Sequence, residues 1–197
     1  MISTKRQKHC FMEKKMTQRI KTYTWQDVEN AVRNIAMQMY KDNWRPDYIV
    51  GITRGGLVPA VLLSHMTGIP MHTLCVQLAN EDLEENTESN CWMAEDAFGY
   101  VSEEERSIPQ IYSDADRKKN ILIIDDINRG GDAMKWIKQD WQGGCLPDNP
   151  NWDTVWHGNV KFAALLDNVN SKVSMDYCDE EFAEGTDDLW IEFPWEA

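Results

Sequence analysis

The fold is decided by a stretch that runs from residue 120 to residue 133 and reads NILIIDDINRGGDA. Its four consecutive branched aliphatic residues predict a strand buried on both faces, as in a parallel sheet. Asp125 and Asp126 follow at the carboxyl end of that strand, the edge at which open α/β sheets bind ligands. Gly130 and Gly131 then allow a tight turn, and the helical spacing beyond them predicts a helix N-terminus, which favours an anion. Carboxylates for sugar hydroxyls beside a phosphate cradle indicate a sugar-phosphate site.

A second unit of strand, loop and helix lies earlier in the chain. Residues 48–52 predict a buried strand, and residues 57–67 predict a helix that Gly68 ends. The loop between them consists of Thr53, Arg54, Gly55 and Gly56. The guanidinium of Arg54 is a fixed positive charge whose fork fits phosphate oxygens, and the two glycines let backbone N–H groups face an anion. The alternative is an ordinary turn between a strand and a helix.

Both loops resemble those of one enzyme family. The stretch 120–133 resembles the ribose-phosphate-binding motif of type I phosphoribosyltransferases, in which Asp-Asp, three variable residues and Thr-Gly-x-Thr follow a hydrophobic strand. Residues 53–59 resemble the pyrophosphate-binding loop of the purine enzymes, most closely of the xanthine-guanine subgroup. The resemblance implies that Asp125 and Asp126 bind the ribose hydroxyls of phosphoribosyl pyrophosphate (PRPP). The PRPP-binding residues that it implies are Thr53, Arg54, Gly55, Gly56, Asp125, Asp126, Asn128, Arg129, Gly130, Gly131, Asp132 and Ala133.

The sequence departs from the family motif in the loop that would hold the 5′-phosphate, residues 129–133. The two threonines of the motif align with Gly130 and Ala133, so two hydroxyl donors to phosphate are missing. The residue before the first threonine is often an aspartate that acts on the purine, and here it is Arg129, which we interpret as supplying charge in place of the hydroxyls. The catalytic residues implied are Asp125, Asp126 and Arg129, with Asp126 as the ligand of Mg²⁺. No residue is an obvious general base.

The C-terminal segment carries the most specific resemblance. Residues 188–196 read DLWIEFPWE and are similar to the end of xanthine-guanine-type enzymes, in which the positions of Trp190 and Ile191 contact the base. An aromatic face suits a flat purine ring. A family lysine that reads the 6-oxo group of the purine has Asn168 in its place, or Asp167 if the register slips by one; an amide can donate to a carbonyl but lacks the charge. The alternative is an aromatic tail that only packs on the core.

The predicted fold class is α/β, a mostly parallel sheet flanked by helices, and the resemblance implies the type I phosphoribosyltransferase fold. We expect a polar N-terminal extension at residues 1–19 and one domain at residues 20–197. Residues 80–119 would be an enlarged acidic hood inserted before the central strand, with short apolar stretches that bury locally; in the family this segment closes over the active site. The alternatives for it are a solvated surface excursion or an oligomer contact. Other expected elements are a helix that Thr24 caps, a strand at 160–166, a strand at 71–78 and a loop at 143–152.

Composition limits the classes of function. The chain has 197 residues, the length of one domain. Its net charge of −13 makes it a poor candidate for nucleic-acid binding, which rests on lysine and arginine. Its five cysteines are scattered without a C-x-x-C pair and its four histidines show no metal spacing, a pattern that predicts neither a disulfide framework nor a zinc site and favours a reducing cytosol. No run of residues reaches transmembrane length.

The predicted function is that of a cytoplasmic purine phosphoribosyltransferase of nucleotide salvage, with PRPP and a purine base as substrates and Mg²⁺ as cofactor. The enzyme would transfer the 5-phosphoribosyl group to a 6-oxopurine (guanine, xanthine or hypoxanthine) and release pyrophosphate. The altered phosphate loop and the missing lysine favour an alternative, a catalytically degenerate module that binds PRPP or a nucleotide and regulates a partner. By resemblance we expect a homo-oligomer, a dimer or tetramer, with neither nucleic acid nor membrane as a partner.

Overall fold

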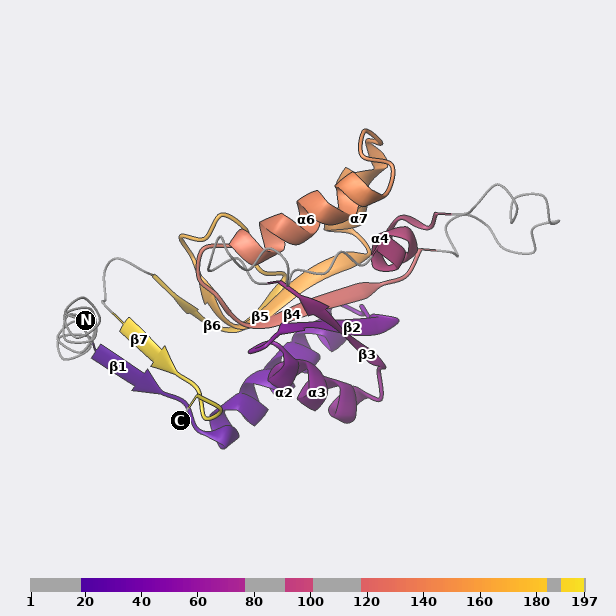
Figure 1. Ribbon diagram of the computed structural model, residues 1–197. Helices are drawn as coiled ribbons and strands as arrows, with labels where there is room; N and C mark the ends of the chain where they lie inside the picture. Colours follow the sequence, from indigo (N-terminus) through magenta and orange to yellow (C-terminus); the bar gives the residue numbers. More distant parts are fainter. Residues whose placement is uncertain (1–18, 77–90, 101–117, 184–188, 197) are drawn as a thin grey trace, which may run out of the picture.

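The computed structural model describes residues 19–76, 91–100, 118–183 and 189–196, and in these a five-stranded parallel sheet forms the centre of the protein (Figure 1). The strands follow the spatial order β3-β2-β4-β5-β6, and each neighbouring pair is parallel. They are β2 (Tyr48–Thr53), β3 (Met71–Cys75), β4 (Ile121–Asn128), β5 (Val160–Asn168) and β6 (Tyr177–Phe182). The predicted α/β class with a mostly parallel sheet is confirmed.

Helices cover both faces of this sheet (Figure 1). One face carries α2 (Trp25–Lys41) and α3 (Leu57–Thr67), and the other carries α4 (Cys91–Phe98), α6 (Asp132–Gly144) and α7 (Asn151–His157). A second, small sheet pairs β1 (Arg19–Thr22) in parallel with β7 (Leu189–Glu192), so the first and last described strands lie side by side. Among the described helices, none has both the length and the apolar character needed to cross a membrane.

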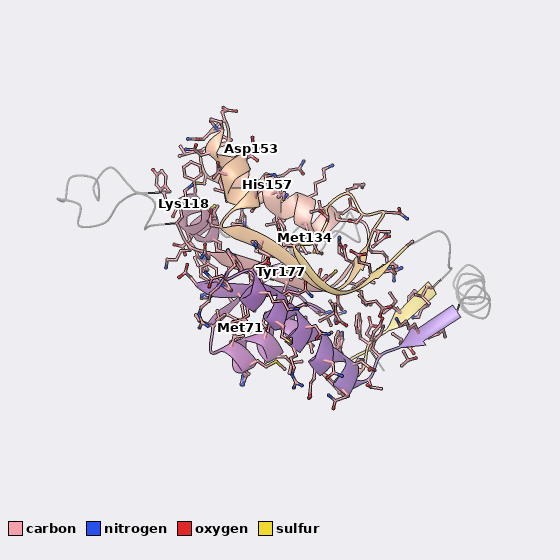
Figure 2. All side chains as sticks on the ribbon, turned by 180° about the vertical axis from the view of Figure 1, so that it is seen from behind. Met71, Lys118, Met134, Asp153, His157 and Tyr177 are labelled. Carbon is pink, nitrogen blue, oxygen red and sulfur yellow. The ribbon has the colours of Figure 1, made fainter. Side chains whose placement is uncertain are left out.

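The central strand β4 is buried on both faces, as its sequence predicts. Ile121 and Ile123 pack in the core cluster beneath α4, α6 and α7, whereas Leu122 and Ile124 pack in the cluster beneath α2 and α3. All four side chains are fully buried. Side chains alternate across a strand, so a strand covered by helices on both sides needs an unbroken apolar run. Met134, in the first turn of α6, packs in the first of these clusters (Figure 2).

Local sequence signals set the ends of the helices α2 and α3. Thr24 Oγ1 accepts a hydrogen bond from the backbone N–H of Asp27 at 3.2 Å, and Asp27 Oδ2 accepts one from the N–H of Thr24 at 2.8 Å. This reciprocal pair is a capping box and fixes the start of α2. At the end of α3, Gly68 adopts a left-handed conformation with φ of 68°. Both boundaries agree with the prediction.

Four expected boundaries are wrong. Strand β4 continues through the acidic pair to Asn128, and β5 continues past residue 166 to Asn168. The loop expected at 143–152 is shorter, because α6 continues to Gly144 and α7 begins at Asn151. A helix as short as α7 shows no clear helical periodicity in its sequence. Buried indole rings hold it in place: Trp152 is fully buried, and its Nε1 donates to the carbonyl oxygen of Cys145 at 2.8 Å. The strand expected at 71–78 ends at Cys75, and residues 77–78 lie outside the described part of the chain.

The segment expected to form the hood contains a helix that belongs to the core. The buried residues of α4 are Met93, Ala94 and Ala97. They join the cluster beneath α6 and α7, and the ring of Phe98 lies 5.3 Å from that of Trp152. The local burial expected within the hood is therefore confirmed for Met93 and Ala97, whereas Cys91, Trp92 and Tyr100 of the same apolar stretches are exposed. Closure over the site stays a prediction, since residues 80–90 and 101–117 lie outside the described residues, as do residues 1–18 of the expected N-terminal extension.

Met93→Ala tests whether α4 is part of the core. Met93 is 1% exposed, and its truncation should lower the free energy of unfolding by about 2–5 kcal/mol, because it leaves a cavity. Glu95→Ala, on the exposed side of the same helix, should change that free energy by no more than about 0.5 kcal/mol. Urea unfolding followed by circular dichroism measures both. Equally small effects of the two substitutions would contradict this place for α4.

Candidate active site

The loop of residues 53–56 lies directly against the acidic pair at the carboxyl edge of the sheet. The strands that lead to them, β2 and β4, are parallel neighbours. A Cβ added to Gly55 would stand 2.0 Å from Asp126 Oδ2, and one added to Gly56 would stand 2.5 Å from the carbonyl oxygen of Ile124. Only glycine fits so close to its neighbours. The glycine-bearing loop of residues 53–56 and the acidic pair, which are far apart in sequence, therefore meet at one edge of the sheet.

The loop after β2 has the features of an anion site. Arg54 is exposed, and the peptide bond between Thr53 and Arg54 is cis. The hydroxyl oxygen of Thr53 is buried and has no hydrogen-bond partner among the described residues. Helix α3 begins directly after the loop, with Gly56 at its N-cap and no side-chain hydrogen bond capping it. A helix N-terminus next to a guanidinium suits a diphosphate.

The two carboxyl groups in the second half of β4 are costly to ionise. Burial raises the pKa of Asp125 well above its ordinary value of 3.8, and the charge of Asp126 raises it further. Burial also raises the pKa of Asp126, and the nearby carboxylate of Glu196 adds to this effect. The backbone N–H of Asp126 donates to Asp125 Oδ1 and that of Ile127 donates to Asp126 Oδ1, each at 2.9 Å. Carboxylates in such a position are stabilised when ligand hydroxyls donate hydrogen bonds to them or when a cation binds beside them.

The loop of residues 129–133, which we call the β4–α6 loop, turns through Gly131. This glycine is the N-cap of α6 and has φ of 78°, in the left-handed region. A Cβ there would stand 2.8 Å from Ser171 Oγ and 2.8 Å from the backbone nitrogen of Val173. The chain that follows β5 thus packs against the β4–α6 loop. The sequence analysis did not predict that the segment after β5 supports this loop. The one signal in the sequence was that the segment follows a strand, as the loop itself does.

Buried polar side chains tie these two segments together. Asn128 is 4% exposed, and its Nδ2 donates to Asp167 Oδ1 and to the carbonyl oxygen of Val173, both at 2.7 Å. Asn168 is equally buried, and its Nδ2 donates to the carbonyl oxygen of Arg129 at 2.6 Å. These two predicted ligand-binding residues therefore hold the backbone of the site in place. That Asn128 contacts PRPP and that Asn168 reads a base stay predictions.

The remaining residues of the β4–α6 loop lie at the start of α6. Asp132 is exposed, and its carboxylate pairs with Lys172 at 2.8 Å. Ala133 is partly buried and packs against the core cluster. The backbone N–H of Lys172 donates to the carbonyl oxygen of Gly130 at 3.3 Å. Lys172 was not predicted as a residue of the site.

The C-terminal segment buries alternate side chains. Ile191 and Phe193 are 6% and 3% exposed and pack in the cluster beneath α2 and α3. Trp190 pairs with Ile20 of β1 and is half-buried. Because the side chain of Ile191 packs in the core, a contact between Ile191 and a base would have to use the backbone, which is the role that the resemblance implies.

Comparison with known proteins identifies a family for this chain. The sequence profile of the phosphoribosyl transferase domain matches residues 21–197. This chain belongs to the phosphoribosyl transferase domain family. Among the relatives that it matches, the xanthine-guanine phosphoribosyltransferases of Idiomarina loihiensis and Vibrio atlanticus are each 23% identical to it. Each match covers 88% of this chain, and covers 84% and 87% of the two relatives.

Solved structures share the fold of this phosphoribosyl transferase domain. The purine phosphoribosyltransferase from Pyrococcus horikoshii has a TM-score of 0.57 at 23% identity, covering 90% of this chain and 95% of that one. The xanthine-guanine-hypoxanthine phosphoribosyltransferase of Helicobacter pylori has a TM-score of 0.59 at 18% identity, covering 91% and 95%. At these identities the likeness shows the fold alone, and it confirms the expected type I phosphoribosyltransferase fold.

Asp125→Asn should raise the free energy of unfolding of this phosphoribosyltransferase domain at neutral pH. Folding raises the pKa of Asp125 above 3.8, so between the unfolded and folded pKa values the folded chain binds more protons than the unfolded chain. Stability therefore falls as pH rises above 3.8 and levels off beyond the folded pKa. Asparagine cannot ionise, so the substitution removes this loss of stability, and its side-chain oxygen can still accept the hydrogen bond from the N–H of Asp126.

Urea unfolding at a series of pH values measures this effect, and Asp27→Asn is a control of opposite sign. Hydrogen bonds from Thr24 lower the pKa of Asp27, so that carboxylate stabilises the fold at neutral pH and its loss should destabilise it. A fall in unfolding free energy for Asp125→Asn across the whole pH range would contradict the electrostatic account of the acidic pair.

Proposed function

We propose that this protein is a Mg²⁺-dependent purine phosphoribosyltransferase that transfers the 5-phosphoribosyl group of PRPP to a 6-oxopurine and releases pyrophosphate. The approach of Gly55 to the carboxylate of Asp126 is the observation that supports this most. It joins a loop suited to a diphosphate to two carboxylates suited to ribose hydroxyls. Family membership supports the transferase class, and the xanthine-guanine enzymes among the relatives support a 6-oxopurine as acceptor.

Each part of PRPP has residues suited to hold it. Arg54 and the backbone of Gly55 would bind the diphosphate. Asp125 and Asp126 would accept hydrogen bonds from the ribose hydroxyls, and the β4–α6 loop at the start of α6 would hold the 5′-phosphate, with Arg129 supplying positive charge. Fixing both ends of PRPP removes much of the entropy cost of bringing the reactants together.

The base would lie against the C-terminal segment. Trp190 offers a half-buried ring to a flat purine, and the backbone of Ile191 would read the edge of the base with the amide of Asn168. A purine nitrogen would form a bond to the anomeric carbon as the bond from that carbon to pyrophosphate breaks, and the proton that this nitrogen loses would pass to solvent. Positive charge would develop on the ribose during this exchange, and the carboxylates of Asp125 and Asp126 would stabilise it.

The acidic pair fits Mg²⁺ as an ion shared with the substrate. Within the described residues, no three histidine, cysteine, aspartate or glutamate side chains gather into a metal site. Mg²⁺ commonly takes one or two carboxylates and fills its other positions with water and phosphate oxygens. Asp126, where the carboxylate of Glu196 adds negative charge, would hold the ion. When bound, Mg²⁺ neutralises charge on the pyrophosphate leaving group.

A homo-oligomer in the cytoplasm is part of this proposal. Helix α3 exposes Val61 and Met66, each 43% accessible, and contains no acidic or basic residue other than His65. In a chain of net charge −13, such an uncharged apolar face is where two copies could meet with least repulsion. The scattered cysteines support a reducing compartment.

A second candidate function is a regulatory module that binds PRPP or a nucleotide without turnover. Three features of the β4–α6 loop favour it. Arg129 stands where the family often has an aspartate, and neither Gly130 nor Ala133 carries a hydroxyl. The first function assigns Arg129 a role in charge stabilisation, whereas the second needs it only for binding.

Nucleotide formation from PRPP and Mg²⁺ with guanine, xanthine or hypoxanthine distinguishes the two candidates. The enzyme should convert at least one of these bases and should leave adenine unused as the control. Asp125→Asn combined with Asp126→Asn should lower kcat/KM by about 100-fold or more, because it removes charge that acts in the transition state. Pyrophosphate release that survives the double substitution would refute the role of the acidic pair. Binding of PRPP without turnover of any base would establish the second candidate instead.

A further inference from the structure

A carboxylate lies over the loop that would hold the 5′-phosphate. Asp132 is the first residue of α6, and its Oδ2 lies 3.0 Å from the point that a Cβ on Gly130 would occupy. The side chain therefore folds back over the backbone of the β4–α6 loop. It brings negative charge to the helix N-terminus at which a phosphate would bind. A carboxylate and a phosphate beside the same loop repel each other, and a cation next to the carboxylate reduces that repulsion.

Lys172, from the segment after β5, supplies that cation. Its Nζ donates to Asp132 Oδ1 at 2.8 Å, and its backbone N–H donates to the carbonyl oxygen of Gly130 at 3.3 Å. Both ends of the lysine are thus attached to the β4–α6 loop. This ion pair lowers the pKa of Asp132, so the carboxylate is ionised at neutral pH. The two side chains are 63% and 61% exposed, and an exposed pair of this kind adds little to stability.

We propose that Lys172 is a positioning residue for PRPP, which holds the Asp132 carboxylate at the outer side of the β4–α6 loop and offsets its charge so that the loop accepts the 5′-phosphate. The inference rests on the proposed function, because the phosphate in question is that of PRPP. The absence of the two threonine hydroxyls of the family motif makes this charge compensation more important. With glycine at 130 and alanine at 133, the loop must bind phosphate with backbone N–H groups and Arg129, and an uncompensated carboxylate would oppose both.

Lys172 acts through Asp132 in this proposal, whereas a lysine that touched the phosphate itself would act alone. A double-mutant cycle separates the two cases. If Lys172 acts through Asp132, its removal should matter only while the carboxylate is present. If it contacts the phosphate, its removal should cost as much after Asp132→Asn as before.

Titration calorimetry with PRPP and Mg²⁺ measures the cycle. Lys172→Gln should raise the Kd of PRPP about tenfold, because it leaves an unpaired carboxylate beside the phosphate, and Lys172→Arg should keep it within about twofold because it retains the charge. In the Asp132→Asn background, Lys172→Gln should change the Kd by less than about twofold. Lys135→Gln is the matched control, since Lys135 is an exposed lysine of α6 that affects Asp132 through charge without a hydrogen bond; it should leave the Kd within about twofold.

Three results would overturn the inference. If wild-type protein binds PRPP and Lys172→Gln binds it equally well, Lys172 has no positioning role and the proposed function stands. If the cost of Lys172→Gln persists in the Asp132→Asn background, the lysine does not act through Asp132. If wild-type protein binds no PRPP, the proposed function fails and this inference fails with it. In active protein, Lys172→Gln should raise the KM for PRPP and leave kcat and the thermal midpoint unchanged, which a structural defect would not do.

Discussion

The close approach of the loop of residues 53–56 to the acidic pair of β4 is the constraint on which the site depends. Parallel pairing of β2 with β4 brings the loop and the pair to the same edge, and Gly55 then leaves room for the carboxylate of Asp126. Any side chain at Gly55 would occupy the position of that carboxylate. The backbone thus sets the distance between the group suited to a diphosphate and the groups suited to a ribose, and the surrounding side chains supply charge.

Two half-buried carboxyl groups side by side oppose folding, and the core around β4 offsets that cost. The strand packs apolar side chains on both of its faces, and this packing fixes the position of Asp125 and Asp126 at the partly exposed end of the strand. Asn128 and Asp167 then fix the next segment of chain behind the site through a buried hydrogen bond at 2.7 Å. The two carboxyl groups by themselves disfavour folding, and the well-packed scaffold around β4 keeps them in place.

The sequence predicted the features whose signals are local. The aliphatic run before Asp125 specifies a strand buried on both faces, and the pair Thr24 and Asp27 specifies a helix start. Individual side-chain contacts that hold the scaffold together were not predicted. Helix α7 needs the burial of Trp152, and the hydrogen bond from Asn168 to the β4–α6 loop joins residues 39 apart in the chain. The ion pair of Lys172 with Asp132 spans a similar interval, so no sequence pattern announces it.

Two loops that hold opposite ends of one activated sugar should each bind their own fragment of it. Titration calorimetry of ribose 5-phosphate into protein saturated with pyrophosphate and Mg²⁺ tests this most directly. We expect one molecule of each fragment to bind per chain at the same time, and we expect Arg54→Gln to weaken pyrophosphate while leaving ribose 5-phosphate unaffected. Fragments that exclude each other, or protein that binds neither, would contradict a shared PRPP site at this edge of the sheet.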